Sequence, residues 1–128
     1  MKPLCEVVSQ DVLPAVRALV AKIMIERHGF SQKSAAERLG TTQPAISQYM
    51  SRIRGQKTKV FNKYPRVMEK IGEFAEGIAK GEITPDQTTP RFCEICRMMV
   101  KEGMICELHR EMYPSLCSCS ICIDKRIC

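Results

Sequence analysis

The chain lacks any apolar run of about 18 residues, the length that a helix needs to cross a bilayer. Its first residues also lack the basic stretch, the apolar stretch and the small-residue cleavage site of a secretory signal. We therefore expect a cytoplasmic protein with no membrane partner. At 128 residues, the chain has room for one domain with an appendage and one modest core.

Acidic residues are scarce in residues 51–70, which hold seven Lys and Arg residues against the single acid Glu69. The net charge of this segment, +6, equals that of the whole chain, so the remaining sequence is neutral. A basic cluster of this kind is suited to DNA phosphates, whose neutralisation dominates affinity for DNA. The alternative is a solvated lysine-rich surface.

Residues 31–50, SQKSAAERLGTTQPAISQYM, have the pattern of two short helices joined by a turn. Ser31 is a favourable N-cap for the first helix, and Gly40 is a favourable stop. Thr42 can cap the second helix, with Pro44 in its first turn. The positions expected to face inward are Ala35, Ala36, Leu39, Ile46 and Tyr49. The segment predicts a helix-turn-helix, with an ordinary helical hairpin as the alternative.

Polar side chains at the start and on the outer face of the second helix are the predicted base-reading residues: Thr42, Gln43, Ser47 and Gln48. Gln43 is the best candidate for a bidentate contact to adenine. Phosphate contacts are expected from Gln32 and from the basic residues after the second helix: Arg52, Arg54, Lys57 and Lys59. Because one such unit buries little surface, we expect a homodimer on a pseudo-palindromic operator of double-stranded DNA.

The flanking sequence predicts further helices and a boundary. Helical periodicity extends over residues 11–27, and an amphipathic helix over 65–80 either completes the core or pairs two subunits. Between them, Phe61 and Tyr64 are expected to anchor a basic loop to the core. Residues 81–90 are polar with two prolines and indicate a linker. The predicted fold is mainly α, with a helix-turn-helix domain (1–80) and a Cys-rich module (91–128).

Seven of the eight cysteines lie in residues 91–128, a segment with few large branched apolar residues for a core of its own. A piece this short usually needs metal or disulfides to hold its shape. The spacing is Cys93-x2-Cys96, Cys106-x2-His109 and Cys117-x-Cys119-x2-Cys122, with Cys128 last. Such spacing indicates a bound metal, whereas a disulfide framework suits secreted proteins. Cys5 stands apart and is expected to be buried rather than to be a ligand.

Two kinds of metal centre fit this spacing. A zinc site would take Cys93, Cys96, Cys106 and His109, leaving the other tail cysteines as a possible second set. An iron–sulfur cluster would take thiolates from Cys93, Cys96 and Cys106 and a fourth from later in the tail. The predicted ligands are Cys93, Cys96, Cys106, Cys119 and Cys122, with His109, Cys117 and Cys128 as alternates.

The pattern SQ…A…LG…TQ…AIS in residues 31–47 resembles the helix-turn-helix of Cro and phage-repressor-type regulators. The start of the chain and the Cys-rich tail, FCEIC…IC…H, are similar to archaeal regulators with an iron–sulfur C-terminus. This resemblance implies a transcriptional regulator whose cluster senses redox or iron status. The alternatives are a structural zinc module and a metal-dependent interaction adaptor. We expect no enzyme, since Cys106 and His109 have no accompanying oxyanion motif.

Overall fold

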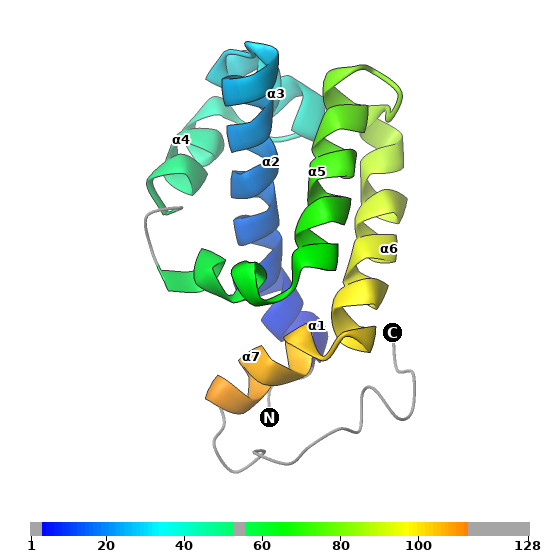
Figure 1. Ribbon diagram of the computed structural model, residues 1–128. Coiled ribbons are helices and arrows are strands. Elements are labelled where there is room, and N and C mark those ends of the chain that lie inside the picture. The colour runs from blue at the N-terminus through cyan, green and yellow to red at the C-terminus, as the bar shows by residue number, and fades with distance from the viewer. Residues whose placement is uncertain (1–3, 53–55, 113–128) are drawn as a thin grey trace.

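The computed structural model describes residues 4–52 and 56–112, which form helices joined by turns and contain no strand. The predicted mainly α class is confirmed for this part of the chain. Figure 1 shows a central rod made of α1 (Leu4–Val7), a π-helical turn η1 (Val8–Val12) and α2 (Leu13–His28). The rod begins earlier than the expected residue 11. It ends as expected at Gly29, whose φ of 70° is readily adopted by glycine.

Two pairs of helices flank this rod. On one side lie α3 (Gln32–Leu39) and α4 (Gln43–Arg52), and on the other lie α5 (Pro65–Ala79) and α6 (Thr88–Lys101), with α6 packed against α5 rather than against the rod itself. A 3-10 helix, η2 (Gln56–Lys63), connects the two sides, and α7 (Met104–Met112) contacts α1 at one end of the molecule. None of the described helices is long and apolar enough to cross a membrane.

One hydrophobic core joins nearly all of these helices. Its buried members include Val16, Val20 and Met24 from α2, Val67, Ile71, Phe74, Ala75 and Ile78 from α5, Ile95 and Met99 from α6, and Met104 and Ile105 from α7. The apolar stripe predicted on residues 65–80 therefore completes the core of the chain itself, one of the two predicted alternatives.

The segment expected to be a linker is a compact turn between α5 and α6. Gly81 has a φ of 77°, and the single 3-10 turn η3 (Pro85–Gln87) follows with Thr84 as its N-cap. The polar residues and prolines that indicated a linker are therefore turn and capping residues. Residues 91–112 share the common core instead of forming a separate unit. Methionine and isoleucine side chains along one face of α6 and α7 are buried in that core and attach these helices to it.

Two smaller expectations also differ from the structure. Residues 56–63, expected as a loop, form η2, although the predicted anchoring holds: Phe61 is only 1% exposed and Tyr64 packs against the core. Cys5, expected to be buried, is exposed. It lies on the short helix α1, in which Val7 is fully buried instead.

Candidate nucleic-acid interface and cysteine positions

The ends of α3 and α4 are set by the capping residues that the sequence indicated. The backbone N–H of Ser34 donates to Ser31 Oγ at 3.1 Å, and the N–H of Ser31 donates to Ser34 Oγ at 3.0 Å. This reciprocal pair begins α3, and Gly40, with a φ of 66°, ends it. The N–H of Ala45 donates to Thr42 Oγ1 at 3.3 Å and caps α4. The predicted start and end of α3 and the predicted start of α4 are therefore confirmed.

Small side chains allow α2, α3 and α4 to meet closely. Ala21, Ala36 and Ile46 form a cluster of their own, with Ala36 3% exposed and Ile46 fully buried. Leu39 and Tyr49 pack around it and are partly buried. Because Ile46 anchors one side of α4, the residues on the opposite side of this helix face outward.

The four predicted base-reading residues, Thr42, Gln43, Ser47 and Gln48, are all exposed. No acidic residue occurs in α4. Within the described part of the chain, no side-chain hydrogen bond engages the amides of Gln43 and Gln48. This face of α4 therefore presents polar, uncharged side chains whose donors and acceptors are available to a partner.

Two arginines attach these helices to the rest of the fold. Arg17 on α2 donates from Nη1 to the hydroxyl of Tyr49 on α4 at 3.2 Å. Arg38 on α3 donates to the carbonyl oxygen of Ile78 at 3.3 Å, and its guanidinium lies 5.7 Å from the ring centroid of Phe30. The orientation of α3 and α4 is thus tied to α2 and α5 by polar contacts as well as by packing.

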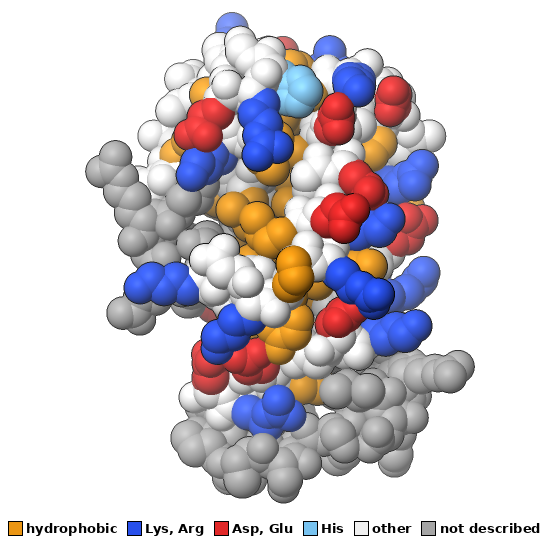
Figure 2. Space-filling model, in the orientation of Figure 1, with side chains coloured by type: hydrophobic (Ala, Val, Ile, Leu, Met, Phe, Trp, Pro, Cys, Tyr) orange, Lys and Arg blue, Asp and Glu red, His pale blue; other side chains and the backbone are white. Residues whose placement is uncertain are grey.

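The predicted phosphate-contacting residues are only partly described. Gln32 is half-buried in the first turn of α3, and Lys59 is exposed on η2. Arg54 lies outside the described residues, as do the side chains of Arg52 and Lys57. On the face drawn in Figure 2, acidic and basic side chains are intermingled over α5. That face therefore does not offer the uniform positive charge that DNA phosphates favour.

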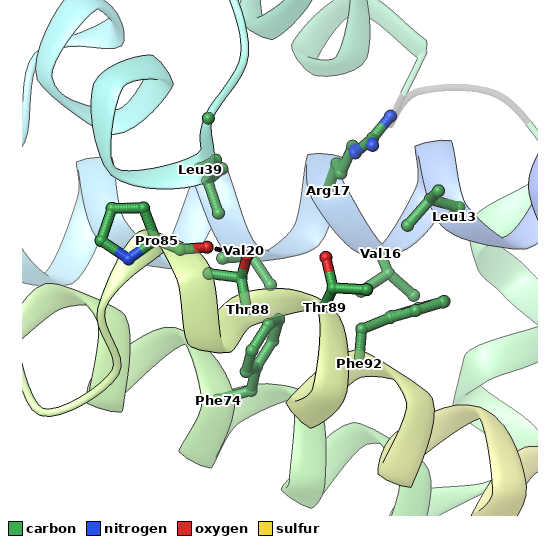
Figure 3. A pocket seen from close by; sticks show the side chains of 11 residues that line it. Leu13, Val16, Arg17, Val20, Leu39, Phe74, Pro85, Thr88, Thr89 and Phe92 are labelled. Carbon is green, nitrogen blue, oxygen red and sulfur yellow. Dashed lines mark hydrogen bonds between the residues drawn. The ribbon is translucent and has the colours of Figure 1, made fainter.

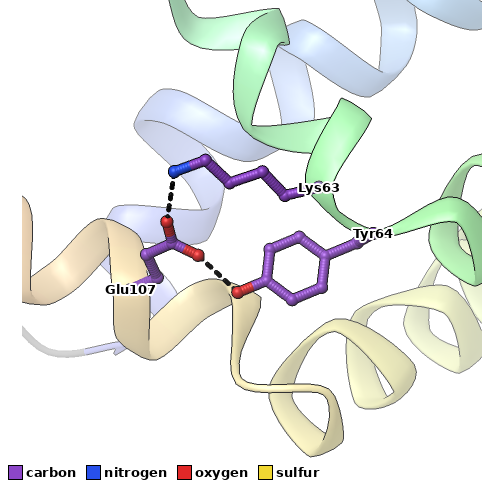
Figure 4. Close-up of polar contacts among 3 residues, drawn as sticks. All are labelled: Lys63, Tyr64 and Glu107. Atoms are coloured by element: carbon purple, nitrogen blue, oxygen red, sulfur yellow. Dashed lines mark hydrogen bonds and ion pairs between the residues drawn. The ribbon is translucent and has the colours of Figure 1, made fainter.

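A contact that the sequence did not indicate joins η2 to α7. Lys63 Nζ lies 2.7 Å from Glu107 Oε1, and the Tyr64 hydroxyl donates to the other oxygen of the same carboxylate (Figure 4). Burial, aided by this hydrogen bond, raises the pKa of Tyr64 to about 12. The hydrogen bonds from Lys63 and Tyr64 hold the pKa of Glu107 below its usual range. These partners are more than 40 residues apart, so no local pattern could reveal the contact.

The structure places the described cysteines on α6 and α7. Cys93 is exposed and Cys96 is half-buried one turn later, so both thiols lie on the same side of α6. Cys106 is 4% exposed on α7, and His109 is half-buried on the same helix. Among the described residues, no three Cys, His, Asp or Glu side chains gather as a metal site would require. Cys117, Cys119, Cys122 and Cys128 lie outside these residues.

Comparison with protein-family models, with curated proteins and with solved structures gave no match to this chain. The function is therefore inferred from the residues and their geometry alone.

Proposed function

We propose that this protein is a sequence-specific, DNA-binding transcriptional regulator in which α3 and α4 act as a helix-turn-helix. The observation that supports it is the exposed surface of α4, where four polar side chains without charge lie at the start and along the outer side of a helix that is anchored by the buried Ile46. Side chains of this kind read the hydrogen-bonding edges of bases in the major groove. A helix held rigidly on its scaffold presents them in a fixed geometry.

Each predicted residue has a role in this proposal. The amide of Gln43, in the first turn of α4, pairs with the N6 and N7 edge of an adenine, and Thr42, Ser47 and Gln48 contact neighbouring bases. Phosphates are contacted on either side of the recognition helix by Gln32, Arg52, Arg54, Lys57 and Lys59. A homodimer would place two copies of α4 on half-sites about one helical turn apart.

The cysteines support a second part of the proposal, an iron–sulfur cluster. Cys93 and Cys96 fit two of its ligands, because their thiols share one side of α6 and Cys93 is exposed. Cys106 and the tail cysteines Cys119 and Cys122 are the proposed further ligands, with His109, Cys117 and Cys128 as alternates. When bound, the cluster supplies a group that responds to redox or iron status. A purely structural zinc site, or a metal-dependent adaptor for another protein, is the alternative.

The test of the regulator starts with selection of duplexes that the full chain enriches from a random pool. Binding of the enriched duplex is then measured by fluorescence anisotropy for the wild type and for Gln43→Ala. We expect the substitution to weaken binding by about 1–3 kcal/mol and to relax preference at one base position. Affinity for unrelated duplexes should stay unchanged, because the phosphate contacts remain.

A matched control is Gln10→Ala, which removes an exposed glutamine from η1 and leaves α3 and α4 intact. This variant should bind like the wild type. If Gln43→Ala preserves the ratio of specific to non-specific affinity, α4 is not the recognition helix. If no duplex is enriched at all, the adaptor alternative replaces the regulator.

A further inference from the structure

A cavity of about 310 Å³ lies where α2, α5 and α6 meet the turn between α3 and α4 (Figure 3). Its apolar wall is formed by Leu13, Val16, Val20, Leu39, Phe74 and Phe92. At roughly 30 Å³ per water molecule, this space corresponds to about ten waters. It therefore suits a compact molecule of about ten heavy atoms, at the small end of ligand-binding pockets.

One cation, Arg17, is among the residues that line this space. Arg17 on α2 is half-buried, and it forms no ion pair with any of the described acidic residues. The hydrogen bond described for it goes to a neutral partner, the hydroxyl of Tyr49 at 3.2 Å. A guanidinium carries five N–H donors in a planar fork, so most of its donor capacity remains for an anion. Removing a cation from water without an anionic partner is costly, which favours a bound counter-ion here.

The hydroxyls on α6 differ in their availability. Thr88 Oγ1 donates to the carbonyl oxygen of Pro85 at 2.7 Å and is occupied. No hydrogen bond of Thr89 Oγ1 is found within the described part of the chain, and Figure 3 shows this hydroxyl directed towards α2 across the cavity. Arg17 on α2 and Thr89 on α6 thus line the same space, and in Figure 3 the Arg17 guanidinium extends beyond α2 on the side away from Thr89.

We propose that this cavity binds a small monocarboxylate with a compact apolar body. The carboxylate accepts hydrogen bonds from the guanidinium of Arg17 and from the hydroxyl of Thr89. The apolar body lies against Phe74 and the aliphatic side chains around it. A planar carboxylate matches the fork of an arginine with two parallel N–H···O bonds, whereas a neutral polar group cannot supply the missing charge.

The same arginine connects the cavity to α4. A carboxylate that accepts two parallel hydrogen bonds from Arg17 would reorient its guanidinium and draw it away from the Tyr49 hydroxyl, whose hydrogen bond is one of the polar contacts holding α4 to α2. Leu39 and Gly40, at the turn between α3 and α4, also line the cavity. The ligand would therefore favour an arrangement of α4 without the Arg17–Tyr49 hydrogen bond. Because the ligand binds this arrangement more tightly than the one with the hydrogen bond, it would change the affinity for DNA. This regulatory consequence rests on the proposed function, whereas ligand binding does not.

Isothermal titration calorimetry on the full chain tests the binding step without DNA. The probes are 3-phenylpropanoate and its neutral analogue 3-phenylpropan-1-ol, which share an apolar body. The wild type should bind the acid at least about tenfold more tightly than the alcohol, as expected for a charge-assisted hydrogen-bonded pair. Arg17→Met, which keeps an apolar stem, should lose this preference, whereas the matched control Arg27→Met on the exposed end of α2 should keep it.

Equal affinity of the wild type for acid and alcohol, or a preference for the acid that survives Arg17→Met, would overturn the proposal. Thermal melting checks that the variants are folded. Should Arg17→Met fail to fold, Thr89→Phe provides the second test, because its exposed position on α6 tolerates a ring that would fill the cavity. This variant should lose binding of both probes, and retained binding would place the ligand elsewhere.

The coupling to α4 is tested with the enriched duplex. A saturating concentration of 3-phenylpropanoate should change the affinity of the wild type for DNA several-fold. Tyr49→Phe, which lacks the competing hydroxyl, should still bind the acid but show no such change. An equal response in this variant would overturn the role of the Arg17–Tyr49 contact. If the wild type binds no DNA, the proposed function fails, and the calorimetry alone decides whether the cavity binds a carboxylate.

Discussion

At the scale of single residues, Glu107 joins the middle of the described chain to its last helix, α7. It accepts from the neighbouring residues Lys63 and Tyr64 of the segment between α4 and α5, and it follows Cys106 directly on α7. The contact thus connects the basic segment to the cysteine-bearing helix. Since it is made by residues distant in sequence, only the folded chain reveals it.

Replacing Glu107 with glutamine should lower the pKa of Tyr64 from about 12. The pKa should stay above that of an exposed tyrosine, near 10, because burial is the larger cause and remains. The measurement is an ultraviolet titration of tyrosinate, with Tyr64→Phe used to assign the transition. Glu111→Gln, an exposed neighbour on α7, is the control and should leave the titration unchanged. An unaltered Tyr64 transition in Glu107→Gln would show that the hydrogen bond does not form in solution.

The same contact gives stability a defined dependence on pH. The pKa of Tyr64 is raised on folding, so its contribution is present below about pH 10 and is lost as pH rises through about 12. The pKa of Glu107 is lowered, so its contribution is present above the usual carboxyl pKa of about 4.3 and is lost as pH falls through the folded value. Glu107→Gln should therefore destabilise the chain most between these limits and least in acid.

At the scale of helices, local signals predicted the pair α3 and α4 well. Ser31, Gly40 and Thr42 fix helix ends through hydrogen bonds within a few residues, and such contacts are readable from spacing. The candidate residues followed in turn, because Gln43 lies in the exposed first turn of α4 and Gln48 lies on the side away from the buried Ile46.

Other elements depended on tertiary contacts and were predicted less well. η2 was expected to be a loop because its sequence has no helical periodicity of apolar residues. The burial of Phe61 was predicted, whereas that of Val60 was not. Residues 81–90 resembled a linker because a flexible linker and a compact capped turn are rich in the same polar residues, glycine and proline. Periodicity could not show that α6 and α7 share a core with α2, since their apolar faces are completed by residues far away in sequence.

The close approach of α3 to α2 and α4 should depend on the small side chain of Ala36. Ala36→Leu would insert three extra carbons into the cluster with Ala21 and Ile46, and we expect a loss of roughly 1–3 kcal/mol in the free energy of unfolding. Urea unfolding followed by circular dichroism measures it. The matched control is Glu37→Leu, which adds the same side chain at an exposed position of α3. Equal stability of the two variants would mean that the helices do not cross closely at Ala36.

At the scale of the whole molecule, one core makes α6 and α7 part of the same structure as α2 and α5. Ile95, Met99, Met104 and Ile105 are each at most 5% exposed. Burying a side chain of this size stabilises a fold by about 1.5–3 kcal/mol. Hydrophobic packing therefore holds residues 91–112 in place, in contrast to the expectation that this segment needs a metal to keep its shape.

This packing predicts how the protein responds to loss of its proposed cofactor. Anaerobically purified wild type should contain iron and sulfide, or zinc in the alternative, and Cys93→Ser/Cys96→Ser should lose it. Because Cys93 is exposed and Cys96 packs only against the edge of the core, the double variant should keep its helical circular dichroism and a cooperative thermal transition. Cys5→Ser, an exposed thiol on α1, is the control and should keep both the metal and the fold. A metal-free wild type would contradict the cofactor. Loss of the helical signal of α6 and α7 in the double variant would instead show that the metal, rather than the shared core, holds these helices.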